Sequence, residues 1–128
     1  MPGIVVDSSV LIDHLRGVAR ATEFLERERR RGPLQVPALA VWELWKGATN
    51  ARRRAGVHEL LSSVDVDSFA PAMAQLAGEL YVRLRATGRT PPSFDLLIAS
   101  HALLRGLPLA TRDRDYSAIP GLQVVTVD

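Results

Sequence analysis

Hydrophobic residues along the chain alternate between short continuous runs and longer stretches with helical spacing. Short apolar runs are typical of buried strands and amphipathic stretches of helices, so their alternation predicts a parallel sheet covered by helices. We predict strands over residues 4–6, 34–36, 64–66, 107–111 and 122–127. We predict helices over residues 8–16, 19–31, 37–49, 51–61, 70–87 and 94–105. The expected fold class is α/β, a three-layer α/β/α sandwich around a mostly parallel, four- to five-stranded sheet.

Several residues mark where these elements begin and end. Asp7 or Ser8 is placed to cap the first helix, and Gly17 lies just beyond its end. Ser93 is expected to cap the last helix, and Pro108 argues for a late start of the fourth strand. Neither a repeat nor a long linker divides the sequence, so we expect a single domain over residues 1–128.

Four acidic residues occupy equivalent places in this pattern, at or just after a strand-to-helix crossing or at a helix start. Asp7 follows the first strand and Asp113 follows the fourth, while Glu43 and Asp95 lie early in helices. In an open parallel sheet, ligands bind at the carboxyl ends of the strands. If the first and fourth strands are neighbours, these carboxylates converge on one rim of the sheet.

Each acid also has a structural interpretation. Asp7 can serve only as a helix cap, Asp95 only as a favourable charge at a helix N-terminus, and Asp113 only as a turn residue. Glu43 is harder to explain in this way, because tryptophan and leucine residues flank it and the surrounding face is not clearly solvated. The coincidence of all four on one rim favours a shared site.

Electrostatics dictates what such a cluster needs. Two like charges about 4 Å apart repel by ~4 kcal/mol at an effective dielectric of 20, so clustered carboxylates must take up protons or bind a cation. The chain has no cysteine and only three scattered histidines, so the cation would be a hard one such as Mg²⁺ or Mn²⁺. Such an ion can activate water for phosphodiester hydrolysis. Ser9 and Thr111 are candidates to hold the ligand carboxylates in place.

Composition and charge narrow the possible partners. With 47% hydrophobic and 23% charged residues, the chain has the composition of an ordinary globular protein. It lacks a signal peptide pattern and a membrane-spanning stretch, so we expect a cytoplasmic protein that does not enter membranes. If four of the 14 acidic residues are committed to one pocket, the rest of the molecule carries 16 basic residues and only ten acidic ones. Such an excess of positive charge suits a polyanionic partner. The arginine clusters at 29–31 and 52–54 can track phosphates or can simply be solvated helix faces.

Four segments together resemble the PIN-domain nucleases, and in particular the compact VapC-type toxins of bacterial toxin–antitoxin pairs. They are residues 6–13 (VDSSVLID), 43–47 (ELWKG), 94–99 (FDLLIA) and 111–116 (TRDRDY), in the right order over essentially the whole chain. The resemblance implies a PIN fold, Mg²⁺- or Mn²⁺-dependent endoribonuclease activity on RNA, a homodimer, and neutralisation by a small cognate antitoxin. It also implies an acidic quartet of Asp7, Glu43, Asp95 and Asp113, supported by Ser9 and Thr111, with Asp115 in reserve.

Within this hypothesis Asp7, Asp95 and Asp113 hold the metal, while Glu43 either ligates it or positions the attacking water. Arg112 and Arg114 are candidates for phosphate contacts, or they only solvate the loop. The rival function is a catalytically silent PIN-like module that binds RNA or a protein partner.

Two further features are weaker signals. Asp65 and Asp67 form an Asp-x-Asp pattern that resembles a metal motif of topoisomerase–primase domains, but they lie at an expected sheet edge without a partner glutamate. Trp42 and Trp45 are more typical of a core than of an interface, although their helix is also a reasonable place for an antitoxin or dimer contact.

Overall fold

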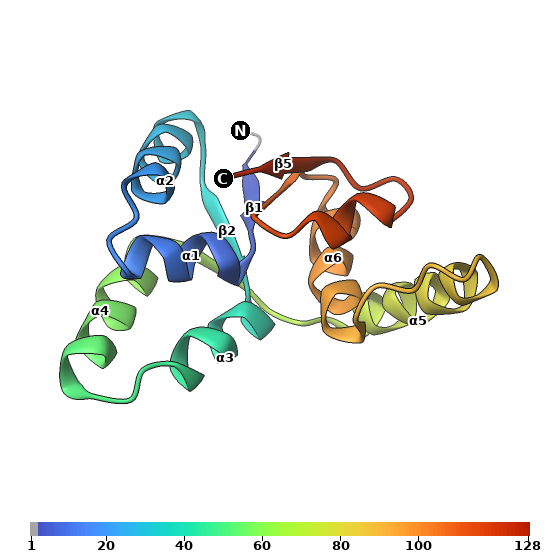
Figure 1. Cartoon of the computed structure of the whole chain (residues 1–128), viewed down its shortest axis with the longest axis horizontal. Coiled ribbons are helices and arrows are strands. Elements are labelled where there is room, and N and C mark those ends of the chain that lie inside the picture. The colour runs from blue at the N-terminus through green and yellow to red at the C-terminus, as the bar shows by residue number, and fades with distance from the viewer. Residues whose placement is uncertain (1–2) are drawn as a thin grey trace.

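The computed structural model describes residues 3–128, which form a five-stranded sheet with helices on both sides (Figure 1). All strand pairs are parallel, and the strand order is β3-β2-β1-β4-β5. The strands are β1 (Ile4–Val6), β2 (Leu34–Pro37), β3 (Asp65–Asp67), β4 (Leu109–Thr111) and β5 (Val124–Thr126). The helices are α1 (Ser8–Leu15), α2 (Ala19–Arg31), α3 (Ala38–Lys46), α4 (Ala51–Leu61), α5 (Pro71–Ala86) and α6 (Ser93–Arg105), with a 3₁₀ helix η1 (Arg114–Ala118).

The layers match the predicted α/β/α sandwich. Helices α1 and α2 lie on one side of β1 and β2, and α6 lies on the other with α5 packed beside it (Figure 1). Within residues 3–128, none of the helices has both the length and the apolar character needed to cross a bilayer.

Strands β1 and β4 form the centre of the core and are neighbours. All three residues of each strand are buried, because helices cover both faces of the sheet. Val5 is in register with Leu109, and Val6 with Ala110. The strand order reverses at this pair, so the carboxyl ends of β1 and β4 form the rim where ligands bind in open α/β sheets.

Several predicted boundaries differ from the structure. Helix α3 ends at Lys46 instead of residue 49, because the chain turns at Gly47 and Asn50 starts α4 by accepting a hydrogen bond from the Arg53 backbone amide at 2.8 Å. Ser93 is the first residue of α6 and not its cap, since Pro92 occupies the cap position without a side-chain hydrogen bond.

The helix η1 is absent from the predicted elements. It begins after Asp113, whose Oδ1 accepts a hydrogen bond from the Asp115 backbone amide at 2.9 Å. A five-residue 3₁₀ turn has too few apolar positions to show a period, so hydrophobic patterning does not reveal it.

Candidate active site

Acidic side chains gather at the rim formed by β1 and β4. Asp7 directly follows β1, Asp113 lies two residues after β4, and Asp95 lies in the first turn of α6. Asp95, Asp113 and Asp115 each offer one carboxylate oxygen within 4.8 Å of the others. Among the described residues this close group includes neither Asp7 nor Glu43, but the charge of Asp7 is near enough to act on Asp95.

Asp95 is the most perturbed acid of the group. Burial and the neighbouring carboxylates of Asp113, Asp7 and Asp115 raise its pKa to about 7. Its Oδ2 is buried and has no hydrogen-bond partner in the described part of the chain. Buried carboxylate oxygens are normally satisfied, so this one is a candidate to ligate a cation.

Asp7 is held rigidly by hydroxyl groups. It is buried, and its Oδ2 accepts hydrogen bonds from Thr111 Oγ1 at 2.8 Å and Ser9 Oγ at 2.9 Å. The Asp7 side chain makes no capping hydrogen bond to α1, although Asp7 occupies the N-cap position. The structure therefore does not support the interpretation of Asp7 as only a helix cap. Ser9 and Thr111 contact a carboxylate of the rim, as their positions in the sequence suggest.

Sequence reasoning missed Tyr116, which also faces this site. The side chain is buried, and its hydroxyl donates a hydrogen bond to Asp7 Oδ1 at 3.4 Å. Burial and the nearby charges of Asp7, Asp95 and Asp113 raise the pKa of Tyr116 far above its usual value, so the hydroxyl stays a neutral donor. The only signal in the sequence is an aromatic residue directly after the acidic segment that ends at Asp115.

Glu43 approaches the site from a different side. It lies in α3, and its carboxylate accepts a hydrogen bond from the hydroxyl of Ser8 in α1. Its side chain also lines a groove between α1, α3 and α4. The structure therefore places Glu43 at the junction of the first turn of α1 and this groove.

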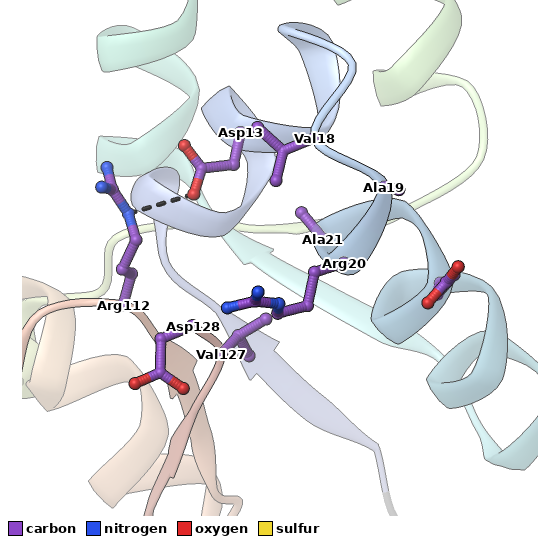
Figure 2. Close-up of a pocket in the computed structure, with 9 residues that line it drawn as sticks. Asp13, Val18, Ala19, Arg20, Ala21, Arg112, Val127 and Asp128 are labelled. Carbon is purple, nitrogen blue, oxygen red and sulfur yellow. Dashed lines mark ion pairs between the residues drawn. The ribbon is translucent and has the colours of Figure 1, made fainter.

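Both candidate phosphate-binding arginines are engaged with surface acids. Arg112 Nε lies 3.0 Å from Asp13 Oδ2, at the edge of a separate hollow of about 700 Å³ that also includes Arg20 and Asp128 (Figure 2). Arg114 Nη2 lies 3.5 Å from Asp128 Oδ2, and both of these side chains are exposed. Each ion pair engages one guanidinium nitrogen, so a phosphate would compete with Asp13 for the charge of Arg112 and with Asp128 for that of Arg114.

In the Asp-x-Asp segment, Asp67 is bound by side chains of α6 and, across residues 3–128, does not belong to a cluster of acids. Asp67 Oδ1 accepts a hydrogen bond from Arg105 Nη2 at 2.7 Å, and Asp67 Oδ2 lies 3.1 Å from Nδ1 of the fully buried His101. These hydrogen bonds, chiefly the one from Arg105, lower the pKa of Asp67 against the opposing effect of burial. Asp65 is exposed. This segment ties β3 to α6 and belongs to the scaffold.

Of the two tryptophans, Trp45 packs against the core as predicted, and Trp42 does not. The Trp42 side chain is 55% exposed, with Lys46 Nζ 4.5 Å from its ring centroid. Trp45 is partly buried and packs edge-on against His58 at 4.8 Å between ring centroids. The expectation of a buried Trp42 is wrong, because α3 has only its Ala40 and Leu44 fully buried and Trp42 lies on another face.

Comparisons with known proteins agree with this fold. The family model for the PIN domain matches residues 4–122 of this chain. The chain therefore belongs to the PIN domain family. Within that family it is similar to Ribonuclease VapC10 of Mycobacterium tuberculosis, at 40% identity over 84% of this chain and 80% of that protein. It is also 30% identical to the tRNA(fMet)-specific endonuclease VapC of Shigella flexneri, over 76% of this chain and 80% of that one.

Solved structures show the same fold. VapBC2 from Rickettsia felis, bound to a DNA fragment from its promoter, matches with a TM-score of 0.88 at 21% identity over 98% of both chains. DNA-bound VapBC from Salmonella typhimurium matches with a TM-score of 0.88 at 23% identity over 100% of both chains. The resemblance to VapC-type PIN proteins seen in the sequence motifs is confirmed.

Proposed function

We propose that this protein is a Mg²⁺-dependent endoribonuclease and the toxin of a toxin–antitoxin pair. The observation that carries this proposal is the buried, unpartnered oxygen of Asp95 among the carboxylates of Asp7, Asp113 and Asp115. Relatives named as a ribonuclease and as a tRNA-specific endonuclease support RNA as the substrate class.

The residues at the rim fit a hard divalent cation. The donors are all carboxylates, which Mg²⁺ and Mn²⁺ prefer, and their mutual repulsion makes cation binding favourable. Asp95, Asp113 and Asp7 would hold the ion, and the position of Asp115 adds a further carboxylate to the set. When bound, Mg²⁺ supplies a Lewis acid that lowers the pKa of water and neutralises charge developing on a phosphodiester.

The surrounding side chains position these acids. Thr111 and Ser9 hold Oδ2 of Asp7, and Tyr116 contacts its Oδ1, so the carboxylate does not reorganise when substrate arrives. The hydroxyl of Ser8 fixes the carboxylate of Glu43. Glu43 then orients the water that attacks phosphorus, or it completes the set of ligands.

Cleavage of RNA by the purified protein tests the activity directly. Bulk RNA incubated with Mg²⁺ or Mn²⁺ should be cut into fragments, and EDTA should stop the reaction, because the carboxylates alone only repel the phosphate. Gel electrophoresis of the products measures this. A protein that binds RNA but leaves it intact with either metal supplied is instead the catalytically silent module.

Mg²⁺ binding should weaken as pH falls below about 7. The Asp95 pKa of about 7 in the metal-free protein means that protons compete with the ion for this carboxylate. Above pH 8 Asp95 is ionised and affinity is constant, while below pH 7 the association constant falls by up to about tenfold per pH unit. Isothermal titration calorimetry in buffers of different ionisation enthalpy measures both the affinity and the released proton. A constant affinity between pH 6 and 8 contradicts Asp95 as a ligand.

Two protein partners belong to the same proposal. Neighbouring structures are VapBC complexes, which supports a small antitoxin as the cognate partner of this chain. We also propose a homodimer, supported by exposed apolar side chains on α5, where Val82 is 68% and Tyr81 is 39% exposed.

A further inference from the structure

A basic groove leads away from Glu43 on the side of the molecule formed by α1, α3 and α4. It has a volume of about 610 Å³, and three exposed arginines line it: Arg16 at the end of α1, and Arg52 and Arg53 in the first turn of α4. Glu43 is the one acidic residue among its lining residues. Within residues 3–128, none of the three arginines forms an ion pair, so their charges face the groove uncompensated.

The floor of the groove contains apolar residues and two glycines. Among the apolar residues that line it, Leu15 is 37% exposed, whereas Leu44 and Val57 are almost fully buried. Gly47 and Gly56 also line the groove. Neither glycine has a positive φ, so the backbone does not demand glycine at either position.

Steric crowding does not require glycine at these two positions either. A Cβ atom on Gly56 would meet Leu15 Cδ2 at 3.6 Å, and one on Gly47 would meet its nearest neighbour at 3.8 Å, which are ordinary contacts. Glycine inside α4 also lowers helix stability relative to alanine. Because neither glycine has a side chain, both leave the volume of the groove open.

We propose that this groove binds a single-stranded segment of RNA next to the bond that is cut. The phosphates contact Arg16, Arg52 and Arg53, and an unstacked base packs against Leu15 and the two glycines of the floor. The inference rests on the proposed function, because it takes RNA as the substrate and the acidic rim as the place of cleavage.

The charges and the shape both favour single-stranded RNA. Three uncompensated arginines against one glutamate attract a polyanion, and guanidinium groups suit phosphate oxygens. The volume lies within the range of roughly 300–1,000 Å³ typical of small-ligand pockets, which suits a base splayed out of a strand. Glu43 lines the groove and accepts a hydrogen bond from Ser8, the residue that follows Asp7 of the rim, so the groove begins beside the rim and one strand could reach both.

Binding of RNA without metal tests the groove separately from cleavage. The probe is a fluorescein-labelled oligouridine of 12 nucleotides in EDTA, and fluorescence anisotropy measures its Kd at several salt concentrations. Arg52→Ala/Arg53→Ala should raise the Kd by about tenfold and reduce the slope of log K against log salt by about 1.4, because two phosphate contacts at about 0.7 each are lost. The matched control is Arg29→Ala/Arg30→Ala, which removes the same charge from exposed positions in the last turn of α2, a helix that does not line the groove.

A second variant tests the floor without changing charge. Gly56→Leu should fill the groove and weaken RNA binding severalfold, while the thermal midpoint of unfolding does not fall. The control is Ala55→Leu, which adds a similar apolar side chain to the same helix at an exposed position that does not line the groove. This control should leave RNA affinity as in the wild type.

The outcomes separate this inference from the proposed function. If the wild type never cuts RNA yet binds it through Arg52 and Arg53, the groove is an RNA site and the nuclease proposal is wrong. The inference is overturned if the wild type shows no measurable RNA binding, or if the groove variants bind RNA as their control variants do. It is equally overturned if they keep RNA affinity but lose binding to an acidic peptide, since the groove then serves a protein partner.

Discussion

Replacing Asp95 by asparagine should abolish RNA cleavage and at the same time stabilise the metal-free protein above pH 7. Loss of this carboxylate removes a metal ligand, and a loss of several kcal/mol of transition-state stabilisation corresponds to at least about a thousandfold in rate. Asparagine keeps the shape of the side chain but removes its repulsion with Asp7, Asp113 and Asp115. Steady-state cleavage assays and denaturant unfolding at pH 8 measure the two effects.

The sign of the stability change follows from the raised pKa of Asp95. In the unfolded chain Asp95 has the ordinary aspartate pKa of 3.8 and loses its proton near that pH, whereas the folded protein holds the proton up to about pH 7. The stability of the metal-free wild type therefore falls as pH rises from about 4 to about 7 and then levels off. After allowance for solvent screening of this partly exposed group, the gain in Asp95→Asn at pH 8 is about 1–2 kcal/mol.

Asp7→Asn provides the comparison. It should also abolish cleavage, but it should lower stability, because an amide group cannot accept all the hydrogen bonds that Thr111, Ser9 and Tyr116 donate to the carboxylate. Opposite stability changes in two equally inactive variants are the expected signature of this rim. Unimpaired cleavage by Asp95→Asn, or a clear loss of its stability, refutes the role given to Asp95.

Asp67→Ala should produce the largest loss of stability among single substitutions of acidic residues. Asp67 is 8% exposed and is the shared partner of Arg105 and the fully buried His101. Removing one partner of a buried ion pair costs about 3–5 kcal/mol, and the half-exposed Arg105 brings the expected cost here to about 2–3 kcal/mol. Thermal and denaturant unfolding at pH 7 give the value.

A control variant and a Mg²⁺ binding measurement test whether Asp67 has only a structural role. Asp65→Ala in the same strand should change stability by less than about 0.5 kcal/mol, since Asp65 is exposed. At a temperature where Asp67→Ala remains folded, its Mg²⁺ affinity should equal that of the wild type. A weakened Mg²⁺ affinity with normal stability would mean that the Asp-x-Asp segment is a metal site after all.

Part of the site was accessible from the sequence because strand ends are local features. A short apolar run followed by an acid places Asp7 and Asp113 at the carboxyl ends of their strands whatever the strand order. Positions of helix starts are likewise local, and they placed Asp95 near the same rim, whereas Glu43 lies later in α3 and outside the close group of acids found among the described residues. Ser9 and Thr111 follow from their distance along the chain to these strand ends.

The sequence by itself determined the alternation of strands and helices, the parallel α/β class, and the acids that end the strands, because periodicity records which face of each element is buried. Only the tertiary structure decided that β4 pairs with β1, that Asp115 joins Asp95 and Asp113, and that Asp67 is held by Arg105 and His101. It also buried Tyr116 against Asp7 and exposed Trp42. These contacts join residues far apart along the chain, and a hydrophobic pattern requires burial without specifying the partner.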